Sequence, residues 1–440
     1  MANVRWPLDG VPVAWQVPLT LGLFISVAML AWSATLFVRA QRARVIAPPA
    51  PIDITNGFVW IFMVPALNEE ITIADSVERL VALELARRRI VVIDDGSTDR
   101  TPEILTGIAN PDLVVLRRDP PNAREGKAAA LNYAYRKIGA MIGETDRSHV
   151  IVVIIDADGR LDGEAPRYAA AHFVDPAVAG VQALVRIYNR WKLLAWMQHN
   201  EFDVYGHLFQ MGRNGYGSAG MGGNGQFNRL SALDWIADDK GPWRDRLTED
   251  QDLGLRLLGC GLWGRQELRA IVNQQGLSAL RPLFRQRTRW SQGNLQAISL
   301  MGEVWRAPFG FGARLELIVY LLMPLWQGLV GFALTIAMVF VISGTLPLWH
   351  NGPLVQLLLV YLLAFGGTVL GTVAARAADG PAGWVHGFLL GHLYAAYTWM
   401  LWPVLLRSTA RQLTERREWA KTERESLEPE NRATQAVSGA

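Results

Sequence analysis

Four stretches of the chain contain no Asp, Glu, Lys or Arg, and they limit the fold more than any other feature. The runs cover residues 13–38, 317–349, 351–375 and 382–406. A helix needs roughly 20 mostly apolar residues to cross the hydrocarbon core of a bilayer, and each run is longer than that. Each run is therefore predicted to form a transmembrane helix, the first as a retained anchor. The chain is expected to be a multi-pass protein of the plasma membrane.

The basic residues beside the first run predict its orientation. Arg39, Arg42 and Arg44 follow the run, whereas only Arg5 precedes it. Because Lys and Arg concentrate on the cytoplasmic side, the residues after the run are expected in the cytoplasm. Four crossings would then place the carboxy-terminal tail outside, although that tail is rich in arginine. Either one run does not cross the membrane fully, or the distribution of basic residues does not determine the side of the tail. The sequence leaves both alternatives open.

The runs divide the chain into segments. The expected organisation is an amino-terminal segment (1–12), a transmembrane helix (13–38), a linker (39–57), a large soluble domain (58–295), an interfacial segment (296–316), three transmembrane helices (317–406) and a polar charged tail (407–440). The net charge of +3 is too small to predict a nucleic-acid partner. The apolar runs predict instead that the lipid bilayer is a partner of the chain.

The soluble segment alternates short apolar runs with helical patterns. Strands are predicted at 58–65, 89–96, 112–118 and 149–159, and helices at 69–87, 101–109 and 127–138. Continuously apolar strands that alternate with helices are typical of a parallel sheet covered on both faces. The fold class is therefore α/β, of a nucleotide-binding, Rossmann-like type.

Acidic residues follow two of these strands. Asp94 and Asp95 close the second strand, and Asp156 and Asp158 close the fourth. Each pair alone is ordinary turn chemistry, but two acidic ends on one edge favour a ligand site, because ligands bind at the carboxyl ends of parallel strands. The spacing of Asp156 and Asp158 suits Mg²⁺ or Mn²⁺ held together with phosphate oxygens. One cysteine and seven scattered histidines leave no zinc-type cluster.

Six short motifs occur in a fixed order and resemble those of family 2 glycosyltransferases. They are "VPALNEE" (64–70), "VVIDDGSTD" (91–99), "EGKAAALN" (125–132), "DADG" (156–159), "TEDQDLGLRL" (248–257) and "QRTRW" (286–290). The last resembles the QxxRW motif of the processive, membrane-embedded members, which make cellulose, chitin, hyaluronan and poly-N-acetylglucosamine. The resemblance covers about residues 58–295 and implies a GT-A fold.

The resemblance also implies roles for individual residues. Asp94 or Asp95 would contact the uracil and ribose of the donor, and Lys127 would lie near the nucleotide. Asp156 and Asp158 would hold the metal and the diphosphate. Asp250 would be the general base, and the donor and acceptor site would be lined by Gln286, Arg289 and Trp290.

Several of these residues also have ordinary structural explanations. Asp250 lies at a predicted helix start where Thr248 can cap, so the acidic residues there can simply complement the helix dipole, and Glu249 is a rival base. The arginines at 285, 287 and 289 suit phosphate but can also flank a membrane. The glycine-rich segment 215–229 is either an acceptor-side loop or a plain flexible loop.

The expected function is inverting transfer from a UDP-sugar, with UDP-N-acetylglucosamine favoured and a divalent metal required. The product would be a growing β-linked glycan, exported through this chain or through an accessory export or regulatory subunit. The alternative is addition of one sugar to a lipid-linked or short acceptor. A transporter would place charged residues inside the apolar runs, and these runs contain none.

Overall fold

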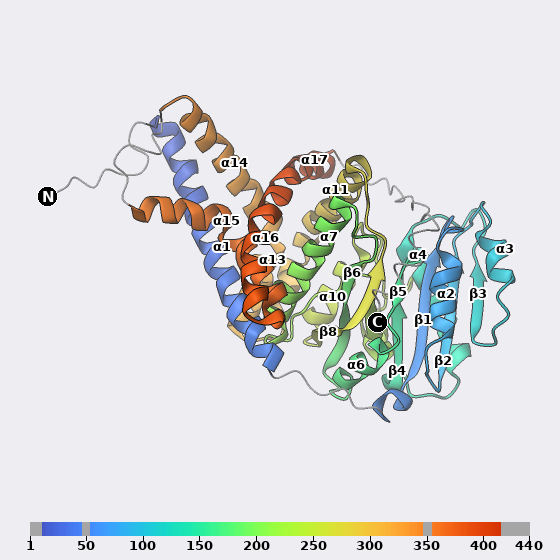
Figure 1. Ribbon diagram of the computed structural model, residues 1–440. Helices are drawn as coiled ribbons and strands as arrows, with labels where there is room; N and C mark the ends of the chain where they lie inside the picture. Colours follow the sequence, from blue (N-terminus) through green and yellow to red (C-terminus); the bar gives the residue numbers. More distant parts are fainter. Residues whose placement is uncertain (1–10, 46–52, 346–353, 415–440) are drawn as a thin grey trace.

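The computed structural model describes residues 11–45, 53–345 and 354–414. An α/β domain occupies one end, and long helices α1, α14 and α15 project from the other (Figure 1). Most of the predicted amino-terminal segment (1–12), part of the linker and most of the polar tail lie outside the described residues.

The α/β domain is built on one eight-stranded sheet. Its strand order is β3-β2-β1-β4-β7-β6-β8-β5. The four predicted strands form, and they pair in parallel as β3, β2, β1 and β4. The next strand, β7, is antiparallel to β4 and to β6, while β6 and β8 are parallel. The bounds are β1 Val59–Ala66, β2 Arg88–Asp94, β3 Leu113–Arg117, β4 Val150–Ile154, β5 Arg160–Leu161, β6 Val178–Ile187, β7 Gln226–Arg229 and β8 Trp263–Gln274.

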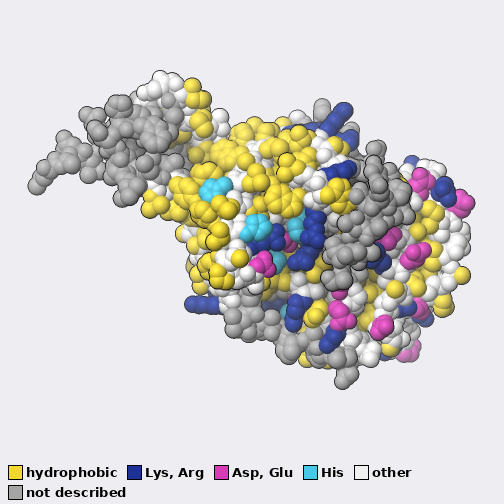
Figure 2. Space-filling model, viewed as in Figure 1, with side chains coloured by type: hydrophobic (Ala, Val, Ile, Leu, Met, Phe, Trp, Pro, Cys, Tyr) yellow, Lys and Arg dark blue, Asp and Glu magenta, His cyan; other side chains and the backbone are white. Residues whose placement is uncertain are grey.

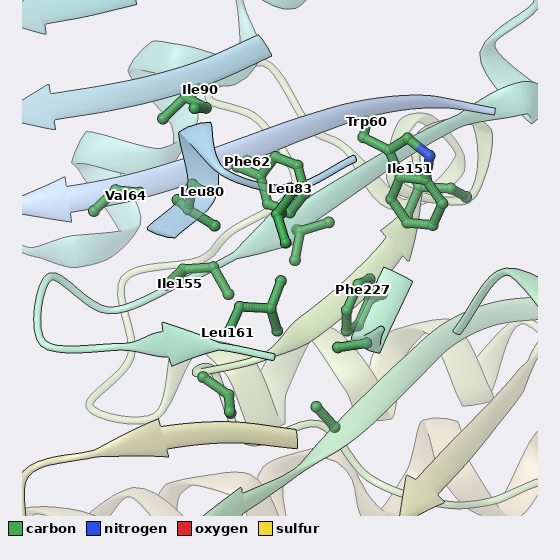
Figure 3. Close-up of a cluster of buried hydrophobic side chains, with 14 of the residues drawn as sticks. Trp60, Phe62, Val64, Leu80, Leu83, Ile90, Ile151, Ile155, Leu161 and Phe227 are labelled. Carbon is green, nitrogen blue, oxygen red and sulfur yellow. The ribbon is translucent and has the colours of Figure 1, made fainter. Parts of the chain in front are cut away.

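Helices cover both faces of this sheet, as the apolar strands predicted. Trp60 and Phe62 of β1 pack on one side with Leu80 of α2, as Figure 3 shows, whereas Ile61 and Met63 pack on the other side. Alternate residues of a strand point to opposite faces, so a strand buried on both faces needs apolar residues throughout. Each such side chain contributes about 1.5–3 kcal/mol by burial. The sheet is therefore a rigid base for the loops at its carboxyl edge.

The α/β domain holds α2 (Ile73–Val81), α3 (Thr101–Thr106), α4 (Lys127–Tyr135), α5 (Ile138–Ile142), α6 (Ala165–His172), α9 (Leu230–Ile236) and α10 (Glu249–Gly259). The remaining helices are α1 (Val13–Val45), α7 (Leu193–Val204), α8 (Met211–Asn214), α11 (Leu280–Ala297), α12 (Met301–Arg306), α13 (Phe311–Leu321), α14 (Met323–Ile342), α15 (Leu354–Arg376), α16 (Gly380–Met400) and α17 (Trp402–Leu413). Three stretches of the described chain are long and apolar enough to cross a membrane: Val13–Ala43, Met323–Phe340 and Tyr361–Leu413.

Two predicted boundaries differ from the structure. The linker was expected from residue 39, but α1 continues to Val45, because arginine ends an apolar run without ending a helix. The second apolar run is not one helix, since α13 ends at Leu321 and α14 begins at Met323 with Pro324 in its first turn. A proline fits there because the first turn needs no donor from its backbone nitrogen.

The last apolar run and the helix after it pack against α7 and α11. The hydroxyl of Tyr397 on α16 donates to Glu201 on α7 at 2.9 Å. Beyond it, the hydroxyls of Ser408 on α17 and Ser291 on α11 lie 2.7 Å apart, and α17 packs along α11. Residues 394–413 therefore lie beside α7 and α11. Both alternatives for the tail stay open.

Candidate active site

A cavity of about 560 Å³ opens at the carboxyl edge of the sheet and reaches the helical layer. Asp95 follows β2 and Asp156 follows β4, as expected for residues that end parallel strands. Asp250 of α10 and Arg289 of α11 also line the cavity. Beyond them the same cavity continues to apolar residues of the long helices. One space therefore joins the polar edge of the sheet to the apolar layer.

The structure brings most of the predicted site residues to this one cavity. Its wall includes Asp95, Lys127, Asp156, Asp250, Gln286, Arg289 and Trp290. Asp94 and Asp158 are not part of that wall. Their roles in binding stay predictions, and their positions are described below.

Lys127 is the central cation of the polar part of the cavity. It is the first residue of α4, directly after Gly126, whose φ of +105° turns the chain into the helix. The Nζ atom lies 2.7 Å from Oδ1 of Asp156 and 3.6 Å from Oε1 of Glu249. Burial opposes the charge, but Asp156, Glu249 and Asp250 outweigh it and raise the pKa of Lys127. Lys127 therefore stays a cation at neutral pH.

Asp250 lies in the first turn of α10, where the sequence predicted a helix start. Burial, and then the neighbouring Glu249, raise the pKa of Asp250 to about 7. Thr248 precedes the helix but does not cap it, because its hydroxyl donates to the side chain of Gln251 at 3.2 Å. Glycine is needed at position 223, since φ there is +82° and a Cβ would lie 2.7 Å from Oδ2 of Asp250. The loop and the carboxylate are thus fitted to each other.

The two residues that end β2 are placed differently. Asp94 is 1% exposed, forms an ion pair with Arg117 and accepts a hydrogen bond from the backbone nitrogen of Ser97 at 2.9 Å. Asp95 lines the cavity and accepts from Nη1 of Arg118 at 2.6 Å. Burial raises the pKa of Asp95 although Arg118 opposes the shift. Asp94 fixes the loop, and Asp95 is the one of the two that lines the cavity.

The predicted metal ligands are also placed differently. Asp156 lies in the cavity wall, and its backbone nitrogen donates to Oδ1 of Asn224 at 3.1 Å. Asp158 is 3% exposed, and its Oδ2 accepts from the backbone nitrogen of Gln275 at 3.0 Å. Within the described residues, no three His, Cys, Asp or Glu side chains form a ready-made metal cluster. Mg²⁺ and Mn²⁺ need only one or two carboxylates when substrate phosphates and water complete the shell, so Asp156 fits such an ion.

The residues of the basic segment 285–290 on α11 lie on different faces of the helix. Gln286, Arg289 and Trp290 are spaced three and four apart, so they share the face that lines the cavity. Arg287 is buried, donates from Nη2 to Oε2 of Glu201 at 2.6 Å and lies 4.1 Å from the Trp290 ring centroid. Arg285 is exposed. The helical spacing of the motif therefore selects the residues that reach the site.

The cavity also contains residues that no local sequence signal marked. They come from distant helices and include Trp32, Glu201, Tyr205, Phe209, Arg213, Tyr320, Leu321, Met323 and Tyr394. Arg213 is buried, donates from Nε to Oε1 of Glu316 at 2.7 Å and lies over the ring of Tyr320. From the glycine-rich segment, Met221, Gly222 and Asn224 reach the cavity, whereas its end forms β7 inside the sheet.

Comparison with known families agrees with this geometry. The model described as glycosyl transferase family group 2 matches residues 151–370, which is half of the chain, and glycosyl transferase family 2 matches residues 61–234. The chain belongs to the family 2 glycosyltransferases. It is therefore a glycosyltransferase with a GT-A domain, as the order of motifs predicted.

Named relatives include enzymes with two kinds of product. The β-monoglucosyldiacylglycerol synthase of Synechocystis sp. is 30% identical over 336 residues, which cover 70% of this chain and 65% of that enzyme. The enzyme of the same name from Nostoc sp. is 33% identical over 245 residues, covering 53% of this chain and 48% of the relative. The poly-β-1,6-N-acetyl-D-glucosamine synthase of Staphylococcus aureus is 28% identical, covering 57% and 58%. The chain thus spans between about half and two thirds of these relatives.

A solved structure has the same fold over nearly the whole chain. The mannosyltransferase PcManGT from Pyrobaculum calidifontis, in complex with GDP-Man and Mn²⁺, superimposes with a TM-score of 0.59 at 19% identity. The match covers 90% of this chain and 100% of that one. At this identity the likeness shows the fold alone.

Proposed function

We propose that this glycosyltransferase transfers a single sugar, with inversion, from a UDP-sugar to the hydroxyl of a membrane lipid. The observation that carries the proposal is the continuous cavity, which joins Lys127 and Asp250 to apolar residues of the long helices. A water-soluble acceptor has no need of an apolar wall. The arginines at the end of α1 support a cytoplasmic position for the GT-A domain.

The donor fits the polar end of the cavity. A nucleoside diphosphate leaving group develops negative charge, which Lys127 and Arg289 are placed to stabilise. Asp95 faces the same space and is proposed to contact the uridine. A divalent ion held by Asp156 and the diphosphate oxygens would supply further positive charge for the leaving group. Asp158 is proposed to act indirectly, by holding the start of the segment after β8 through Gln275.

Asp250 is proposed to remove the proton from the acceptor hydroxyl. A general base is most effective when its pKa lies near the working pH, and the pKa of Asp250 is raised to about 7. Glu249 is held toward Lys127, with 3.6 Å between its Oε1 and Nζ of Lys127. Because this contact engages Glu249 with Lys127, Asp250 is the carboxylate proposed as the base.

The acceptor is proposed to enter from the apolar side. Leu321, Met323 and Pro324 form that wall where α13 meets α14, and Tyr394 of α16 and Trp32 of α1 complete it. Such a wall suits acyl chains, and Trp and Tyr are typical of the level of lipid headgroups. The similarity to the β-monoglucosyldiacylglycerol synthase of Synechocystis sp. supports the same acceptor class.

Filling the apolar wall tests this assignment. Full-length protein in detergent is supplied with UDP-glucose, Mg²⁺ and diacylglycerol, and UDP release and glycolipid are both measured. Met323→Trp, which adds volume inside the cavity, is expected to raise the KM for lipid at least tenfold while slow donor hydrolysis persists. Leu329→Trp, on the exposed face of α14, is the matched control and should behave as wild type. Equal lipid kinetics in both variants would remove the lipid acceptor from the account.

Processive synthesis of a polysaccharide is the second candidate. It is favoured by the QxxRW residues Gln286, Arg289 and Trp290 in the cavity wall and by the similarity to poly-β-1,6-N-acetyl-D-glucosamine synthase. UDP-N-acetylglucosamine is then the expected donor, and a partner subunit would assist export. Long polymer formed without added lipid would favour this candidate, whereas one sugar on each lipid would favour the first.

A further inference from the structure

Helix α7 has charged residues on two different faces. Glu201 and Phe202 face the cavity. His199, Asn200 and Asp203 lie on another face, because residues three and four apart share one side of a helix. His199 Nε2 is 3.4 Å from Oδ2 of Asp203, which is buried. This second face is not part of the cavity wall, so its charges have another role.

Three arginines from different segments surround that face, and together they are named the α7 arginine cluster: Arg186, Arg190 and Arg376. Nε of Arg186 lies 3.8 Å from Oδ1 of Asp203, and Nη1 of Arg376 lies 3.7 Å from Oδ2. These separations are too long for hydrogen bonds. Nε of Arg186, Nε of Arg376 and Oδ1 of Asp203 are buried without a hydrogen-bond partner among the described residues. The cluster thus has unused donors.

The cluster carries an excess of positive charge. Three guanidinium groups face one buried carboxylate, and burial raises the pKa of Asp203. Burial, and then Arg190 and Arg186, lower the pKa of His199 to about 3, so its ring adds no charge at neutral pH. Asp379 also acts on Asp203, and it is exposed to solvent. Among the ion pairs of the described residues, the arginines around Asp203 are therefore in excess.

The position of the cluster matches the level of lipid headgroups. Arg376 is the last residue of α15, whose apolar sequence is part of a candidate membrane span. Directly after Arg190 come Trp191, which is 47% exposed, exposed Lys192, and Leu193, which is 67% exposed. Basic and tryptophan side chains in alternation are typical of a segment at the membrane interface. Figure 2 shows Lys, Arg and His side chains along the border of the hydrophobic surface.

We propose that the α7 arginine cluster binds the phosphate of an anionic phospholipid headgroup. Guanidinium groups bind phosphate oxygens with two parallel hydrogen bonds, and exposed Arg190, beside the partly exposed side chain of Arg186, can supply them. The exposed segment 190–193 then lies in the interface beside the same lipid. Because α7 also lines the cavity through Glu201, the bound lipid holds this wall of the active site against the membrane.

The simpler explanation is a structural network that joins α15 to α7. Arg376 fits it in part, since its Nη2 donates to Oδ1 of Asn200 at 3.0 Å. A purely structural network, however, does not require Arg190 at an exposed position or an exposed Trp191 and Leu193 beside it. The two explanations differ in whether the cluster prefers anionic lipid, and this preference can be measured whatever the acceptor of the enzyme is.

The test is lipid binding by the full chain in non-ionic detergent. Phosphatidylglycerol, phosphatidylcholine or inorganic phosphate is added as the probe, and bound probe is counted by native mass spectrometry. Wild-type protein is expected to bind phosphatidylglycerol at least tenfold more tightly than phosphatidylcholine. With roughly a fivefold contribution from each arginine, Arg186→Gln/Arg190→Gln should weaken phosphatidylglycerol binding by about 25-fold and leave phosphatidylcholine unchanged. Arg190→Gln alone, at an exposed position, should weaken it about fivefold and decides the test if the double variant misfolds.

The control removes the same charge elsewhere. Arg100→Gln/Lys137→Gln changes two exposed basic residues of the α/β domain and should leave the affinity within twofold of wild type. Equal binding of the two phospholipids by wild type, or unchanged binding in the cluster variants, would overturn the proposal. Inorganic phosphate bound as tightly as phosphatidylglycerol would show a free-anion site and would overturn the assignment to lipid.

Discussion

Gly223→Ala perturbs the proposed general base, Asp250, through a neighbouring loop residue. Gly223 has a φ of +82°, and a Cβ there would lie 2.7 Å from Oδ2 of Asp250 and 3.4 Å from Nζ of Lys127. The backbone alone costs about 1–2 kcal/mol, because an L-residue is strained at positive φ. To restore an ordinary contact of 3.4 Å, the carboxylate or the loop must move by about 0.7 Å. A displacement near 1 Å costs on the order of 100-fold in rate.

The assay measures UDP release by full-length protein over a range of donor and acceptor concentrations. Gly223→Ala is expected to lower kcat by about 10- to 100-fold, with a stability loss of about 1–2 kcal/mol. Gly143→Ala is the matched control, since Gly143 has a φ of +55° but no atom within 4 Å of a Cβ. The control should lose similar stability and keep its kcat. If Gly223→Ala kept its kcat within twofold of this control, the placement of Asp250 as the base would be refuted.

Four further experiments test the site. Asp250→Asn should lower kcat by about 10²- to 10⁴-fold, whereas exposed Asp245→Asn should not. A general base acts only when it is deprotonated, and the pKa of Asp250 is raised to about 7. Wild-type kcat/KM should therefore rise with pH up to about 7 and then level off. A profile that is flat from pH 5.5 to 8 would contradict this assignment. Removing divalent ions with EDTA should abolish turnover, and adding Mg²⁺ or Mn²⁺ should restore it. Unchanged turnover in EDTA would show that the reaction needs no divalent ion. Arg213→Met should cost about 3–5 kcal/mol in thermal unfolding by leaving Glu316 buried and unpaired, and Arg213→Met/Glu316→Leu should recover most of that loss.

The parallel half of the sheet could be predicted because burial on both faces forces a continuous apolar run. Residues 58–65 and 149–159 have such runs, and β1 and β4 form there. The strands β6, β7 and β8 could not be predicted in this way. Gln182 of β6 and Gln226 and Asn228 of β7 are buried polar residues. Gln182 donates to the backbone oxygen of Asn224 and Asn228 to that of Val152, whereas Gln226 donates to Asn228 beside it. Their burial follows from the completed fold, so apolar periodicity does not mark them.

The residues of the candidate site also differ in how far the sequence could predict them. Asp95 and Asp156 could be predicted because strand ends place them locally, and Lys127 was predicted from the resemblance of its motif to the family. Asp158 also follows a predicted strand, yet its side chain is buried and accepts a hydrogen bond from the backbone nitrogen of Gln275. Glu201, Tyr394 and Met323 reach the cavity only because α7, α16 and α14 meet there. Contacts between distant helices have no signature in a single sequence, and the acceptor side was therefore the part that sequence patterns described least.

The most direct test of the lipid acceptor is the size and solubility of the product. Full-length protein in phospholipid nanodiscs that contain diacylglycerol is given UDP-glucose or UDP-N-acetylglucosamine with a radiolabelled sugar, and the label is followed into solvent-extractable lipid or water-insoluble polymer. The cavity that joins Lys127 and Asp250 to the apolar wall predicts label in lipid with one sugar on each acceptor, lost in Asp250→Asn. Label found only in long polymer, formed equally well without diacylglycerol, would contradict it.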